Sequence, residues 1–196
     1  YHPWGYEADR QYRGRSWTLE RVPYGAMASP PRRTYLGGRK RVAEQLSRWL
    51  PGEIRAVNLR AQHWMIPELT ARAVSVSADL FIAHYLPAVP AALRAAERHG
   101  AKVGFDAEDF HRGQFHDGEW DTPKARRTRW FEETYLPQCD YVSAASPGIA
   151  AAYADELGVE EPKTILNVFP QSERSGHTPP DELREEHPGR GISLYW

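Results

Sequence analysis

The 196-residue sequence predicts an α/β fold, a Rossmann-like parallel sheet with helices on both faces. Three observations favour this class. Short apolar runs alternate with helical patterns, most regularly from residue 79 onward. The connections between them are short, as in right-handed βαβ units. Apolar residues make up 41% of the chain, which is enough for the core of one such domain.

The regular part of the chain begins with a strand and a helix. The run "DLFIA" (79–83) is apolar throughout, as in a strand that is buried on both faces. In the next segment, 89–100, apolar residues recur at helical spacing and Gly100 provides a C-terminal stop. Five further elements continue the alternation: a strand at 102–106, a helix at 124–137, a strand at 140–145, a helix from Ser146 to Gly158 and a strand at 163–168.

The first 78 residues carry a weaker pattern. Residues 39–52 predict an amphipathic helix, because their apolar side chains fall on one side. A strand is expected within 16–25, a loop at 31–41 and a short helix at 67–77. The segment 171–190 combines proline, glycine and charged residues, which is typical of an interdomain linker.

Charge and cysteine content exclude several classes of function. A net charge of −1 gives no bulk attraction to nucleic acid, so no nucleic-acid partner is expected. A single cysteine, Cys139, rules out an intrachain disulfide and a cysteine-based zinc cluster. No apolar run is long enough to span a bilayer, which favours a cytoplasmic location. The basic stretch from Arg32 to Arg60 leaves room for peripheral contact with the inner face of a membrane.

Polar side chains stand where four of the predicted strands end. His84 follows the first strand, Asp106 and Glu108 end the second, Ser146 follows the third and Asn167 closes the fourth. The carboxyl ends of parallel strands form one rim, and open α/β sheets bind ligands outside that rim. These five residues are therefore the predicted site. Two of them have structural alternatives, since Ser146 can cap its helix and Asp106 can organise the following loop.

The loop after the second predicted strand is dense in residue types that bind metals. No helical i, i+4 histidine pair and no calcium-loop spacing occurs in it, so no metal site is assigned. A solvated loop with one or two ligand-contacting acids is the favoured interpretation, and Trp120 is the tryptophan to test for stacking on a ligand. The loop contains Asp106, Glu108, Asp109, His111, His116, Asp117, Glu119 and Asp121.

Two segments resemble a known family. They are "ADLFIAHYLPAVPAALRAAERHGAKVGFDAEDFH" and "CDYVSAASPGIAAAYADELGVEEPKTILNVFP". Together they resemble the N-terminal domain of GT-B-fold glycosyltransferases of family 4, the group 1 type. The resemblance covers about residues 75–170 and depends on the order and spacing of loose motifs. The first 70 residues match poorly, and the glycine-rich turn that usually follows the first strand of such domains is not found.

The resemblance implies one half of a two-domain enzyme that retains anomeric configuration. Residues 1–170 would hold the acceptor, a glycan or a small molecule, and 171–190 would be the linker. Residues 191–196 would begin a missing C-terminal domain that binds the nucleotide-sugar, a co-substrate, with no other cofactor. The half alone is expected to be inactive.

The resemblance also implies roles for individual residues. His84 matches the family histidine near the transferred sugar and is the catalytic candidate. Asp106 and Glu108 match the acidic pair at the cleft rim, although histidine is common at the second position. Asn167 matches an asparagine that is more often structural. Together with Ser146, these acids and Asn167 are the substrate-binding candidates.

A second class of function stays open. A non-catalytic Rossmann-like module that binds a ligand or Mg²⁺ would use the same acids. A receiver domain would also need acids after its first strand and a lysine late in the sheet, whereas Lys163 precedes its strand. A hydrolase with paired carboxylates lacks a second acid on a separate strand.

Overall fold

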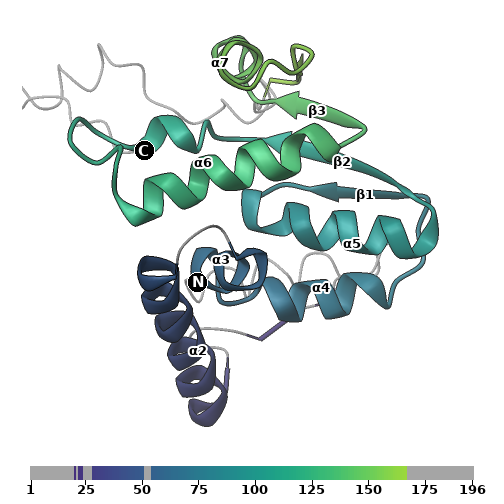
Figure 1. The fold of residues 1–196 in the computed structure, drawn as a ribbon. Coiled ribbons are helices and arrows are strands. Elements are labelled where there is room, and N and C mark those ends of the chain that lie inside the picture. The colour runs from purple at the N-terminus through teal and green to yellow at the C-terminus, as the bar shows by residue number, and fades with distance from the viewer. Residues whose placement is uncertain (1–19, 21, 24–27, 51–53, 167–196) are drawn as a thin grey trace, which may run out of the picture. The chain divides into compact units, whose positions relative to one another are not determined.

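The computed structural model describes residues 20, 22–23, 28–50 and 54–166. Within this part, four strands form one parallel sheet in the order β1-β2-β3-β4 (Figure 1). The predicted α/β class, with a Rossmann-like parallel sheet flanked by helices, is confirmed. The strands are β1 (Leu80–Ala83), β2 (Lys102–Ala107), β3 (Tyr141–Ala144) and β4 (Lys163–Thr164).

The helices that connect the strands begin and end where the sequence places caps. Gly100 and Gly158 end two of them with φ of 67° and 61°, a left-handed conformation that glycine adopts without strain. At the N-terminus of the helix that Gly158 ends, the Ser146 hydroxyl accepts a hydrogen bond from the Ile149 N–H at 3.2 Å. These helices are α5 (Val89–His99), α6 (Pro123–Tyr135) and α7 (Pro147–Leu157), with short 3₁₀ turns η3 (Leu86–Ala88), η4 (Arg112–Gln114) and η5 (Leu136–Gln138).

The N-terminal region is more helical than the sequence pattern indicates. The expected loop at 31–41 is wrong, because these residues lie inside helix α2 (Pro30–Trp49). Prolines are tolerated in the first turn of a helix. Burial of Leu36 and Ala43 stabilises α2 and offsets the low helix propensity of its two glycines. Helix α3 (Arg55–Gln62), which packs against α2, was not expected. Helix α4 (Ile66–Val74) confirms the helix expected at 67–77.

Other expectations concern residues that the structure does not describe. The strand expected within 16–25 falls almost entirely outside the described residues. The linker at 171–190 and the segment 191–196 also lie outside them. The strand expected at 163–168 is shorter than predicted, because β4 ends at Thr164 and residues 165–166 are not in a strand; residues 167–168 are not described. The domain boundary at residue 170 therefore stays a prediction.

The core that the structure describes lies on one face of the sheet. Side chains alternate between the faces of a strand, and Val103 and Phe105 of β2 share a buried cluster with residues of α5, α6 and α7. Leu80, Ile82 and Tyr141 occupy positions of the opposite face and are exposed. The expectation that the strand at 79–83 is buried on both faces is therefore wrong, since only one face of β1 packs against the core. Figure 1 shows α5 and α6 lying along the sheet, with α4 beside α5.

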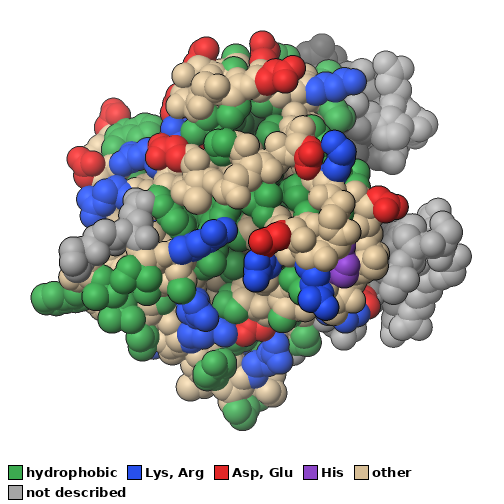
Figure 2. All heavy atoms as spheres, turned by 45° about the vertical axis from the view of Figure 1, so that its right-hand side comes forward, with side chains coloured by type: hydrophobic (Ala, Val, Ile, Leu, Met, Phe, Trp, Pro, Cys, Tyr) green, Lys and Arg blue, Asp and Glu red, His purple; other side chains and the backbone are tan. Residues whose placement is uncertain are grey.

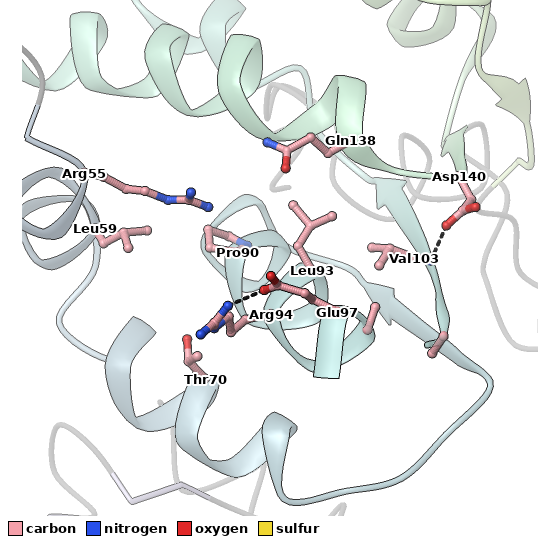
Figure 3. A pocket seen from close by; sticks show the side chains of 12 residues that line it. Arg55, Leu59, Thr70, Pro90, Leu93, Arg94, Glu97, Val103, Gln138 and Asp140 are labelled. Carbon is pink, nitrogen blue, oxygen red and sulfur yellow. Dashed lines mark hydrogen bonds and ion pairs between the residues drawn. The ribbon is translucent and has the colours of Figure 1, made fainter. Parts of the chain in front are cut away.

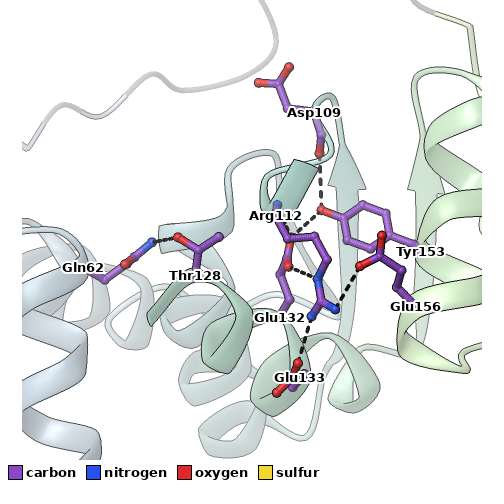
Figure 4. A network of polar contacts seen from close by, with 8 residues as sticks. All are labelled: Gln62, Asp109, Arg112, Thr128, Glu132, Glu133, Tyr153 and Glu156. Atoms are coloured by element: carbon purple, nitrogen blue, oxygen red, sulfur yellow. Dashed lines mark hydrogen bonds and ion pairs between the residues drawn. The ribbon is translucent and has the colours of Figure 1, made fainter. Parts of the chain in front are cut away.

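A buried network of ion pairs joins the loop after β2 to helices α6 and α7 (Figure 4). Arg112 is only 4% exposed, and its Nε donates to Oε2 of the fully buried Glu132 at 2.6 Å. Its other guanidinium nitrogens reach Glu133 at 3.2 Å and Glu156 at 3.3 Å. The Tyr153 hydroxyl donates to Oε1 of Glu132 at 3.0 Å. Arg112 is thus a fixed anchor within the loop that the sequence predicts to be solvated.

The charged state of Glu132 depends on Arg112. Burial raises the pKa of the Glu132 carboxyl, while the Arg112 guanidinium and the Tyr153 hydroxyl favour its carboxylate form. An uncompensated carboxylate in this position would be strongly unfavourable, because the surroundings cannot replace its hydration. The network therefore makes the loop after β2 and the two helices depend on one another.

We expect the substitution Arg112→Ala to lower the free energy of unfolding by about 3–5 kcal/mol, because it leaves the buried Glu132 without its cation. Urea denaturation followed by circular dichroism measures the loss. Arg94→Ala is the matched control, since the Arg94–Glu97 pair is 65% and 67% exposed and exposed pairs contribute little. Equal losses in the two variants would contradict the role given to Arg112.

Candidate functional site

Neighbouring strands bring three polar side chains into one row at the carboxyl edge of the sheet. In the parallel register, Ala83 lies opposite Phe105, and Asp106 lies opposite Ser143. His84 directly follows β1, so it comes level with Asp106. Residues at matching register positions of adjacent strands present their side chains on the same face. His84, Asp106 and Ser143 therefore lie side by side.

Asp106 is the centre of this row. Its Oδ2 lies 3.0 Å from Nδ1 of His84, and its Oδ1 accepts a hydrogen bond from the Ser143 hydroxyl at 2.7 Å. Both carboxylate oxygens have partners, so the orientation of the side chain is fixed. A proton on Nδ1 of His84, directed at Asp106, leaves Nε2 as a hydrogen-bond acceptor.

Exposure increases along the row from Ser143 to His84. Ser143 is buried at 4% exposure, whereas the side chains of Asp106 and His84 are 29% and 67% exposed. The two inner residues are therefore placed to orient the imidazole. The imidazole itself is the part of the row that a ligand in solvent can reach.

Glu108 adds a second carboxylate to the site. One ligand atom from each of His84, Asp106 and Glu108 lies within 4.8 Å of the others. Within the described residues, this is the one group of three such side chains close enough to hold a metal ion. The same arrangement suits two neighbouring hydroxyl groups of a sugar, since carboxylates and an imidazole nitrogen accept hydrogen bonds.

Aromatic contacts fix the loop that carries Glu108. His111 is buried, and its ring lies edge-to-face with Tyr85 at 5.4 Å between centroids. Burial lowers the pKa of His111, which favours a neutral ring in this contact. On the other side, the Phe110 ring packs edge-to-face on Tyr153 at 5.0 Å. The loop is therefore attached both to the segment after β1 and to α7.

The structure brings some of the predicted site residues together and leaves others apart. His84, Asp106 and Glu108 converge, as the sequence predicts. The hydrogen bond that Ser146 accepts is the cap of α7, so the structural alternative for Ser146 is borne out and ligand contact stays a prediction. Asn167 lies outside the described residues. Trp120 is 40% exposed.

Sequence reasoning missed Ser143. The residue interrupts the apolar stretch 141–145, and this interruption is a signal that the sequence does carry. Its contact with Asp106 depends on the register between β2 and β3, which the sequence does not give. The buried acid Glu132 was missed for a similar reason, because only the packing of α6 brings it to Arg112.

Comparison with known proteins gives no independent identification. The chain matches no model of a known protein family. It also matches no curated protein sequence. The function is therefore inferred from the geometry of the site and from the motifs of the sequence.

Proposed function

We propose that the chain is the N-terminal, acceptor-binding half of a retaining glycosyltransferase with a GT-B fold. The enzyme would move a sugar from a nucleotide-sugar donor to an acceptor glycan or small molecule. The observation that carries this proposal is the meeting of His84 and Asp106, 3.0 Å apart, at the carboxyl edge of a parallel sheet. That edge is where open α/β sheets bind ligands. The resemblance of residues 75–170 to group 1 glycosyltransferases gives the reaction class.

In this proposal, His84 is the catalytic residue and the acids bind the acceptor. Nε2 of His84 lies next to the transferred sugar, while Asp106 and Glu108 accept hydrogen bonds from acceptor hydroxyls. Ser146 and Asn167 are further substrate-binding candidates. The donor is bound mainly by a C-terminal nucleotide-sugar domain, where charges and dipoles stabilise the leaving diphosphate. This half therefore has no turnover by itself, and no protein nucleophile and no metal take part.

We expect His84→Ala, in this chain joined to its C-terminal domain, to lower kcat by about a hundredfold or more. The melting temperature should hardly change, because the His84 side chain is 67% exposed and its hydrogen bond to Asp106 lies near the surface. Sugar-transfer assays and thermal melts of the same preparations measure both quantities.

His116→Ala is the matched control, because His116 is an exposed histidine of the loop after β2 that lies outside the site. It should leave kcat unchanged. Wild-type turnover in the His84→Ala variant would remove His84 from the catalytic role. A joined protein that is folded and transfers no sugar would overturn the proposed function itself.

A second candidate is a non-catalytic module that binds a divalent cation. The observation that favours it is that ligand atoms of His84, Asp106 and Glu108 lie within 4.8 Å of one another. Three protein ligands leave coordination positions open for water or for a ligand. An imidazole among the ligands favours Zn²⁺ or Mn²⁺ over Mg²⁺, which prefers oxygen ligands.

Isothermal titration of the chain with zinc, manganese and magnesium chloride tests this candidate. We expect saturable binding of one ion if the candidate is right, and Glu108→Gln should weaken it about tenfold because a charged ligand is lost. His116→Ala should bind as the wild type does. Absence of saturable binding, or binding that Glu108→Gln leaves intact, would rule out the cation module and leave the transferase proposal untouched.

The proposal also includes a cytoplasmic location with peripheral contact at the inner face of a membrane. None of the described helices has the length and apolar character needed to cross a membrane. Helix α2 instead presents Tyr35, Val42 and Trp49 to solvent, with Trp49 82% exposed. Arg41 and Arg48 are exposed on the same helix. Figure 2 shows basic side chains beside hydrophobic ones on the lower part of the face in view, as interfacial helices require.

Sedimentation with vesicles tests the membrane contact. The chain should sediment with vesicles of phosphatidylglycerol and phosphatidylcholine and stay in solution with phosphatidylcholine alone. The double substitution Arg41→Glu and Arg48→Glu should abolish sedimentation, since each basic residue contributes about 1 kcal/mol at an anionic surface. Arg98→Glu, on the exposed side of α5, is the control with a smaller effect. Equal sedimentation with anionic and with neutral vesicles would contradict this contact.

A further inference from the structure

A large cavity within the described residues lies away from the site proposed above. It has a volume of about 690 Å³, within the range of small-molecule sites. Its sheet wall is Val103 at the start of β2, and Asp140 precedes β3, so this wall is at the amino end of the strands. Helices α3, α4 and α5 contribute the other walls (Figure 3).

One cation at this cavity is held in place by an aromatic ring. The Nε of Arg55 donates to the hydroxyl of Tyr135 at 3.1 Å, and its guanidinium carbon lies 5.2 Å from the centre of the Tyr135 ring. Tyr135 is fully buried, so it is a rigid support. In the described part of the chain, the two terminal amino groups of Arg55 form no hydrogen bond. Figure 3 shows the side chain extending toward Pro90 and Leu93.

The other charged groups at the cavity are neutralised by neighbours. Arg94 pairs with Glu97 on the same helix. Asp140 accepts a hydrogen bond from the Val103 N–H at 2.8 Å and is paired with Lys102 at 3.4 Å. Arg55 is therefore the charge in the lining that remains uncompensated among the described residues. A planar guanidinium with two free amino groups matches a carboxylate or phosphate.

The cavity lining also has an apolar part, which indicates the kind of group that could bind beside an anion on Arg55. Leu59, Pro90, Leu93 and Val103 supply apolar side chains to the lining. Burying an apolar ring or short chain on this surface is favourable, and the fixed Arg55 loses little side-chain freedom on binding an anion. We propose that this cavity binds a small organic anion, with its carboxylate or phosphate on Arg55 and its apolar body on Leu93 and Pro90.

Fluorine NMR with trifluoromethylbenzoate as the probe tests this site on the chain as it is. We expect saturable broadening of the probe signal, and much weaker binding of the neutral analogue trifluoromethylbenzyl alcohol. Arg55→Gln should raise the dissociation constant at least about tenfold, since hydrogen bonds to a charged group are lost. Arg98→Gln, an exposed arginine of α5 outside the cavity, should bind as the wild type does. Competition by benzoate and by phenyl phosphate then shows which anion is preferred.

A second variant keeps the test decisive if Arg55→Gln unfolds. Thr70→Phe places a larger side chain in the cavity without changing its charge, and it should also weaken probe binding. Equal affinity for the neutral analogue, no saturable binding, or full affinity in a folded Arg55→Gln or Thr70→Phe variant would overturn the proposal. None of these results depends on sugar transfer or on His84.

Discussion

The parallel register of β1, β2 and β3 is the constraint on which the candidate site depends. It sets Asp106 opposite Ser143 and brings His84 level with both. Because side chains alternate along a strand, a shift of β2 by one residue would turn Asp106 toward the core and Phe105 toward the site. The buried cluster around Phe105 prevents such a shift. Packing on one face of the sheet thus determines which side chains are presented on the other face.

The network around Arg112 provides the second constraint, on the loop rather than the strands. A guanidinium has enough donors to reach carboxylates on two helices at once, which a lysine ammonium could not do with the same geometry. Arg112 therefore holds the chain soon after it leaves β2, while the contact of His111 with Tyr85 holds it against the segment after β1. Glu108 lies between the sheet and these anchors, so its position is limited from both sides.

The sequence predicts those parts of the fold that follow from local pattern. Apolar runs and glycine stops locate the strands and helices from residue 79 onward, and strand ends locate His84, Asp106 and Glu108. The prediction of a loop at 31–41 was wrong. Paired prolines and paired glycines indicate turns locally, whereas burial of Leu36 favours the helical conformation of α2. Partners that are distant in the chain, such as Ser143 for Asp106 or Tyr135 for Arg55, require the register and the helix packing. No local pattern contains them.

The strand order has a consequence for how the domain assembles. Each strand pairs with the next one along the chain, so every pairing closes a single connection. The entropy lost on closing a loop grows only by about 0.6 kcal/mol for each doubling of its length, so no step is much harder than the others. The strands can thus assemble in the order in which the ribosome synthesises them. His84 and Asp106 would meet in the first β-α-β unit, before the residues that hold Asp106 and the neighbouring loop in place have joined it.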